Sequence, residues 1–96
     1  MELYDFQLLN RQKGFHFFER ATMRFFKSRV SNWDEQTGLF ITSEKGPSNV
    51  CKYTIRQANF KSGAVDTLGN FQAYNTIGAA KTALKNIRVN VLGLLK

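Results

Sequence analysis

The chain has 96 residues but only one cysteine, one histidine and one proline. A single Cys51 excludes an intramolecular disulfide and a thiolate cluster for zinc or iron–sulfur. This cysteine shares the predicted core face of a strand with Tyr53 and Ile55, so we expect a buried thiol without a reactive role. His16 lies among three phenylalanines in the segment GFHFF, which favours a partly buried structural histidine over a general base.

Motifs that carry catalysis are also lacking. The glycines at 63, 69 and 78 form neither a P-loop nor a dinucleotide-binding fingerprint. Asp34 and Glu35 are adjacent in a predicted turn and Asp66 is the only acid of its half, so no carboxylate pair suggests acid–base or magnesium chemistry. We therefore expect a protein that is not an enzyme and holds no metal or cofactor. The alternative is an unfamiliar active site that depends on Cys51 or His16.

Long apolar runs are missing as well, since none approaches the roughly 18 residues of a membrane span. The first residues carry Glu2 and Asp5 instead of the basic start of an export signal. We expect a cytoplasmic protein with no membrane partner. The hydrophobic fraction of 43% and the nine phenylalanines suit one aromatic-rich core. The sequence therefore predicts a single domain over 1–96.

Acidic residues are scarce in the second half of the chain. Residues 1–48 hold seven basic and six acidic side chains, whereas residues 49–96 hold seven basic side chains and only Asp66. The net charge of +7 therefore comes almost entirely from the second half. A surplus of this kind attracts polyanions or acidic protein surfaces. The alternative is that the lysines serve solubility alone.

Hydrophobic spacing predicts helices at both ends and strands between them. The segment 1–13 reads as an amphipathic helix that ends at Gly14, and a second helix is expected from Glu19 over ERATMRFFKSR. The intervening segment 15–18 is left open between a strand and an extended lead. A loop is expected over 31–38, a strand over 38–44 and a break over 45–49.

The next strand is predicted over 50–60, with Tyr53 and Ile55 facing the core while Lys52 and Arg56 point the other way. A turn at 61–63 makes an antiparallel hairpin with 64–68, and 71–74 suits a further short strand after a break at 69–70. The last helix begins after Thr76 as N-cap. Its buried row comprises Ile77, Ala80, Leu84, Ile87 and Val91. These elements predict the α+β class, a small antiparallel sheet of three to four strands packed with two to three helices.

Basic side chains recur at helical spacing on both longer helices. One row comprises Arg20, Arg24 and Lys27, and the other comprises Lys81, Lys85 and Arg88. The second row lies opposite the apolar residues, so we expect all three to be replaceable without disturbing the core. These two rows are candidate partner- or nucleic-acid-binding residues. Three further candidates come from the predicted strand and the turn after it: Lys52, Arg56 and Lys61. The alternative is that these are solvated surfaces.

Aromatic residues alternate with basic ones in RFFKSR, KYTIR and NFKSG. Such interleaving binds single-stranded nucleic acid through base stacking and phosphate pairing, or it reflects core aromatics with solvated neighbours. Phe60, at a predicted turn, is the least certain of the core aromatics. The apolar residues after Arg88 should pack on the core or on a second chain, so a homodimer through the C-terminal tail is possible.

The segments MRFFKSR, GLFITSE, YTIRQ and DTLGNFQAYNT resemble those of small uncharacterised proteins carried by bacterial phages and mobile elements. The resemblance spans residues 15–84 and leaves out the first helix and the tail after Arg88. It implies an accessory protein that binds a host nuclease or nucleoprotein complex, most concretely an anti-CRISPR-like inhibitor of host defence. The alternatives are a direct DNA- or RNA-binding protein and an assembly protein.

Overall fold

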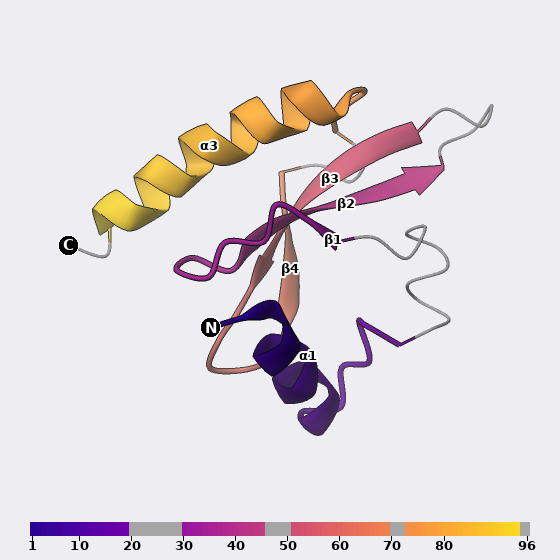
Figure 1. The fold of residues 1–96 in the computed structure, drawn as a ribbon, viewed down its shortest axis with the longest axis vertical. Coiled ribbons are helices and arrows are strands. Elements are labelled where there is room, and N and C mark those ends of the chain that lie inside the picture. The colour runs from indigo at the N-terminus through magenta and orange to yellow at the C-terminus, as the bar shows by residue number, and fades with distance from the viewer. Residues whose placement is uncertain (20–29, 46–50, 70–72, 95–96) are drawn as a thin grey trace.

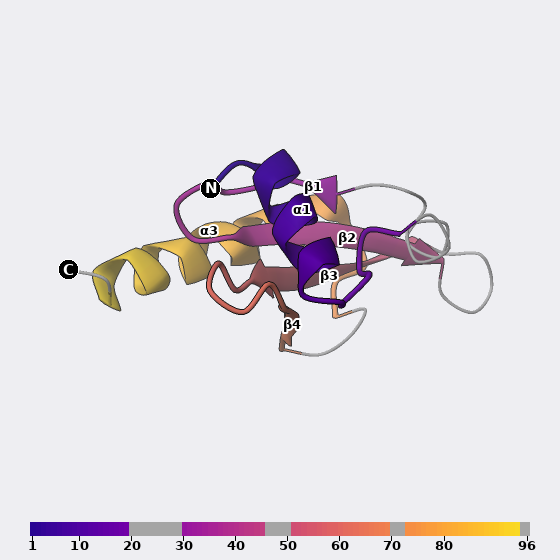
Figure 2. The same cartoon turned by 90° about the horizontal axis from the view of Figure 1, so that it is seen from below.

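The computed structural model describes residues 1–19, 30–45, 51–69 and 73–94. Two helices in these ranges lie on opposite faces of a four-stranded antiparallel sheet, as Figure 1 and Figure 2 show. The predicted α+β class is confirmed. The elements in chain order are α1 (Leu3–Gln12), β1 (Val30–Ser31), β2 (Leu39–Lys45), β3 (Cys51–Ala58), β4 (Val65–Leu68) and α3 (Ile77–Leu94).

The sheet has the strand order β1-β2-β3-β4, so each strand pairs with its sequence neighbour. The central pair aligns Ile41 with Ile55 and Phe40 with Arg56. The predicted hairpin between β3 and β4 is confirmed. Its turn is held by Asn59, whose Oδ1 accepts hydrogen bonds from the backbone N–H groups of Lys61 at 2.9 Å and Ser62 at 3.0 Å.

One face of the sheet packs against α3. Side chains alternate between faces along a strand, so Leu39 and Ile41 of β2 and Ile55 of β3 project to the same side. There they meet Ala80 and Leu84 of α3 in one buried cluster. The predicted core contact of the final helix is therefore confirmed.

The other face packs against α1 through aromatic rings. Phe6 and Phe40 are fully buried there, and Trp33 and Phe60 pack around them. The Trp33 and Phe40 ring centroids are 5.5 Å apart, and those of Phe6 and Phe60 are 6.1 Å apart. Phe60 therefore belongs to the core, although its place in a turn left this open.

Asn10 ties the end of α1 to two other segments. Its side chain is 1% exposed. Its Nδ2 donates a hydrogen bond to the carbonyl oxygen of Gly63 at 2.7 Å, and its Oδ1 accepts one from the backbone N–H of Phe17 at 2.9 Å. Both the donor and the acceptor atom of this buried side chain therefore have hydrogen-bond partners, and these bonds position α1 over the β3–β4 turn.

Three details differ from the sequence interpretation. Arg56 does not lie on a solvated face, because both faces of the sheet are covered and its exposed fraction is 8%. His16 is exposed rather than partly buried, in a left-handed turn with φ 57°. Cys51 is half-buried near the start of β3, where a buried thiol was expected.

Several predicted elements lie outside the described residues. The helix expected from Glu19 lies outside them except for Glu19 itself, and so does the predicted break at 45–49 except for Lys45. Residues 70–72, which belong to the predicted break and short strand after β4, also lie outside them. Tyr74 forms an isolated antiparallel bridge with Tyr53, which confirms sheet pairing at the end of the short strand predicted over 71–74.

Neither of the two described helices is long and apolar enough to cross a membrane.

Candidate functional site

The start of α3 follows from local chemistry at Thr76. The hydroxyl Oγ1 of Thr76 accepts a hydrogen bond from the backbone N–H of Ala79 at 3.1 Å, which confirms the predicted N-cap. The helix then runs for 18 residues without an acidic side chain. Its apolar row anchors it on the sheet, so the opposite side is presented to solvent.

We call this solvent side the outer face of α3. All of its residues are exposed, and they comprise Gly78, Ala79, Lys81, Thr82, Lys85, Asn86, Val89 and Asn90. The face therefore combines two ammonium groups, two carboxamides and one hydroxyl with small or apolar side chains. Lys81 and Lys85 stand one turn apart and have no hydrogen bond or ion pair to another residue of the described ranges.

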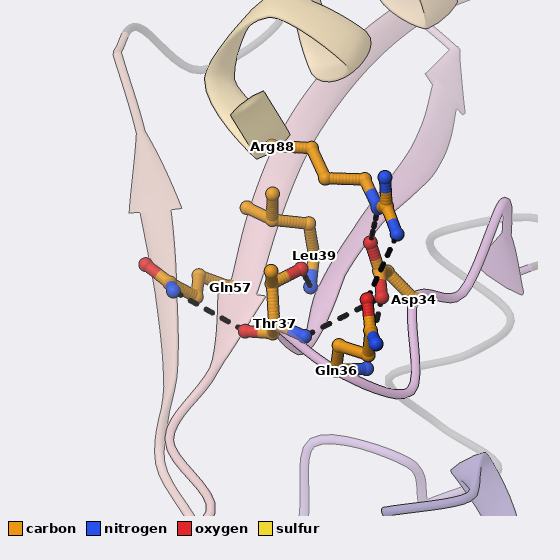
Figure 3. A network of polar contacts seen from close by, with 6 residues as sticks. All are labelled: Asp34, Gln36, Thr37, Leu39, Gln57 and Arg88. Atoms are coloured by element: carbon orange, nitrogen blue, oxygen red, sulfur yellow. Dashed lines mark hydrogen bonds and ion pairs between the residues drawn. The ribbon is translucent and has the colours of Figure 1, made fainter. Parts of the chain in front are cut away.

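Arg88, the third member of the predicted row, does not belong to the outer face. It is half-buried, its Nε donates to Oδ2 of Asp34, and its Nη2 donates to Oε1 of Gln36 at 3.0 Å. Figure 3 shows the guanidinium reaching from α3 to the turn before β2. The expectation that all three basic residues could be replaced without structural cost is therefore wrong for Arg88.

Asp34 organises the turn that receives Arg88. Its Oδ1 accepts backbone hydrogen bonds from Gln36 at 2.9 Å and Thr37 at 3.4 Å. Burial raises the pKa of the Asp34 carboxyl, but the N–H of Gln36, the side chain of Arg88, the N–H of Thr37 and the Arg88 charge together hold this pKa below its ordinary value of 3.8. The carboxylate is therefore ionised at neutral pH and neutralises Arg88.

The remaining predicted binding residues are dispersed. Lys52 donates to Oδ1 of Asn75, next to the N-cap of α3, and so lies near the beginning of that helix. Lys61 is exposed in the β3–β4 turn, which packs beside the end of α1. The row of Arg20, Arg24 and Lys27 lies outside the described residues.

Arg56 is engaged inside the protein. Its Nε donates to the hydroxyl of Thr42 at 3.2 Å and its Nη1 to the hydroxyl of Thr67. Its guanidinium also lies 5.8 Å from the centre of the Phe17 ring. A buried arginine with these contacts stabilises the α1 side of the sheet and is not available to a partner.

Three polar residues of the outer face were missed in the sequence interpretation. Thr82, Asn86 and Asn90 follow one another at four-residue spacing, which places them on adjacent turns. The signal in the sequence is this regular spacing of polar side chains in a segment without an acidic residue. The charged side chains alone do not reveal it.

A pocket lies on the α1 side of the sheet. Its lining includes Tyr4, Arg11, His16 and Glu19. The carboxylate of Glu19 lies 3.5 Å from Nε of Arg11 and 3.5 Å from Nδ1 of His16, so these three side chains contact one another. Within the described ranges no group of three histidine, cysteine, aspartate or glutamate side chains is placed to hold a metal ion.

A family profile described as "Family of unknown function (DUF7447)" matches residues 2–85. The chain belongs to this family. The DUF7447 match includes α1, which lies outside the resemblance expected from the sequence, and it ends within α3 at Lys85. It therefore contains both lysines of the outer face. No curated protein and no solved structure matches the chain.

Proposed function

We propose that this DUF7447 protein is a non-enzymatic binding protein that attaches to a nucleic-acid-containing host complex or nuclease through the outer face of α3. The observation that carries the proposal is the composition of this face. Lys81 and Lys85 project to solvent from a helix that has no acidic side chain.

Electrostatics favours a polyanionic target for this face. Unpaired ammonium groups on a rigid helix attract phosphate groups, and each phosphate that they neutralise releases counterions. The neighbouring carboxamides of Asn86 and Asn90 add hydrogen-bond donors, which are the groups that contact phosphates and base edges in protein–nucleic acid interfaces. Arg88 does not contribute, because Asp34 already compensates its charge.

The most concrete form of this function is inhibition of host defence, as the resemblance to phage-borne proteins implies. A basic inhibitor cannot imitate the acidic surface of DNA. It would instead contact guide RNA, an acidic protein surface or an assembly interface of a CRISPR effector.

The test is co-purification and cleavage inhibition with a panel of bacterial CRISPR effectors and host nucleases. We expect a complex of defined stoichiometry with one of them, and a Lys81→Glu/Lys85→Glu variant that folds normally but loses most of its affinity. The control is Lys13→Glu, a charge reversal at an exposed lysine of the α1 side, which is compared with Lys81→Glu and Lys85→Glu made singly. Absence of a complex with every effector would remove the inhibitor form of the proposal.

Direct binding of DNA or RNA is the second candidate, favoured by the two carboxamides beside the two lysines. A gel-shift titration at two salt concentrations tests it without any host protein. Affinity should fall steeply as salt rises, because counterion release drives the binding. Negligible binding at low salt would contradict it.

A further inference from the structure

Resting on the proposed nucleic-acid contact, we infer that α3 binds double-stranded DNA by entering the major groove, where Asn86 and Asn90 read base edges and Lys81 and Lys85 contact the flanking phosphates.

The shape of α3 fits this groove. An 18-residue helix is about 27 Å long and, with side chains, about 10–12 Å across. The major groove of B-form DNA is about 12 Å wide and about 8.5 Å deep. Figure 1 and Figure 2 both show the C-terminal half of α3 reaching past the ends of β2 and β3, so the sheet does not obstruct its outer face.

The chemistry of the outer face differs between its middle and its flank. With about 3.6 residues per turn, Thr82 and Asn90 lie about 40° to either side of Asn86. Lys85 and Lys81 lie about 100° and about 140° from Asn86, both toward the same edge of the outer face. A carboxamide can bond both N6 and N7 of adenine, and an apolar side chain such as that of Val89 can contact the thymine methyl group. Lysines at the edge of the helix are placed for phosphates instead.

Single-stranded nucleic acid fits this face less well. Proteins that bind single strands stack bases on exposed aromatic rings beside their cations. The outer face of α3 contains no aromatic residue, and Phe60 packs in the core. The exposed rings of Tyr4 and Phe15 belong to α1 and the segment after it, across the sheet from α3.

Double-stranded RNA and a second copy of the chain are also disfavoured. The major groove of A-form RNA is deep and narrow, so protein side chains cannot read it. Two antiparallel copies of α3 packed through their outer faces near the middle would bring Lys85 close to its own counterpart. No acidic residue of α3 could compensate this repulsion.

The first experiment compares four nucleic acids by fluorescence anisotropy at low and moderate salt: a randomised DNA duplex, the same sequences as single strands, and RNA duplexes and single strands of equal length. We expect tightest binding to duplex DNA, with a salt slope that falls by about one for each lysine replaced by glutamine at 81 and 85. Equal or tighter binding to single strands or to RNA would overturn the inference and leave the proposed function standing.

The second experiment selects a preferred sequence from randomised duplexes and then replaces each selected adenine by 7-deazaadenine, which lacks the N7 acceptor. We expect Asn86→Ala and Asn90→Ala each to weaken binding to the selected site by about 5- to 100-fold. The deaza base should weaken the wild type but have little further effect on the matching variant. Gln12→Ala, an exposed carboxamide at the end of α1, is the matched control and should bind as the wild type does.

The base contacts of α3 and its phosphate contacts can fail separately. If the wild type binds duplex DNA but selects no sequence, or if both asparagine variants retain the preference, base reading by Asn86 and Asn90 is refuted while the phosphate contact stands. If the protein binds no nucleic acid at low salt and the Lys81→Glu/Lys85→Glu variant keeps its affinity for the host complex, the proposed role of the outer face fails as well.

Discussion

Arg88 of α3 and Asp34 of the turn before β2 form an ion pair across 54 residues of sequence. The Asp34 side chain is 10% exposed and the Arg88 side chain 42%. This pair joins the final helix to the same turn from which Trp33 enters the aromatic core. It therefore couples the two layers that cover the sheet.

Replacement of Arg88 should cost stability where replacement of its neighbour Lys85 does not. We expect Arg88→Gln to lower the free energy of unfolding by about 1 kcal/mol, because Asp34 loses a charge-assisted hydrogen bond that is partly screened by solvent. Lys85→Gln should change it by less than about 0.5 kcal/mol, as for an ordinary exposed position. Urea titrations monitored by circular dichroism measure both. Equal effects would show that the ion pair contributes nothing.

Acid should weaken the protein partly through Asp34. Because the folded-state pKa of this carboxyl lies below its ordinary value of 3.8, the contribution is fully present above that value and is lost as the pH falls through the folded-state pKa. Asp34→Asn should be less stable than the wild type at pH 7, and the difference should shrink below about pH 4. Urea unfolding at pH 7 and pH 3 gives the comparison. A difference that stays constant between these pH values would contradict the ionised state of Asp34.

Gly38 and Gly78 should respond oppositely to alanine. Gly38 has φ 77°, and a Cβ there would lie 2.6 Å from the carbonyl oxygen of Ala58, so Gly38→Ala should destabilise by about 3 kcal/mol. Gly78 lies in the first turn of α3 with nothing within 4 Å of such a Cβ. Gly78→Ala should therefore stabilise by roughly 0.5 kcal/mol. Thermal unfolding of both variants tests the pair, and a shift in the same direction would refute the interpretation of one site.

Asn10→Ala should be among the more damaging substitutions on α1. It leaves the carbonyl oxygen of Gly63 and the backbone N–H of Phe17 without their side-chain partner, at a cost of about 2 to 4 kcal/mol. Amide hydrogen exchange at Phe17 should accelerate together with the loss of stability. Gln12→Ala, two residues further along the helix and exposed, should leave both measurements nearly unchanged.

Local pattern was sufficient for most of the described elements. The spacing of Ile77, Ala80 and Leu84 specified which side of α3 packs on the sheet, because a helix repeats about every 3.6 residues. The Thr76 cap and the hairpin between β3 and β4 were likewise predictable, since both depend on residues close in sequence. The α+β class followed from the order of these elements.

The alternation of side chains along β3 predicted that Arg56 faces solvent, and this prediction is wrong. A strand with polar residues on one side is expected to face water there, but α1 and the aromatic residues after it cover that side. Whether a sheet is covered on one face or two depends on where a distant helix packs. A two-residue period carries no information about that contact.

Composition by itself determined that this protein carries an excess of positive charge in its second half and that α3 has no acid to offset its lysines. Only the tertiary structure decided which of those charges are available. Lys81 and Lys85 remain exposed, whereas Asp34 binds Arg88 and the sheet buries Arg56. The physical reason is that a charge is neutralised by neighbours in space, and residues 34 and 88 become neighbours only when α3 packs on the sheet.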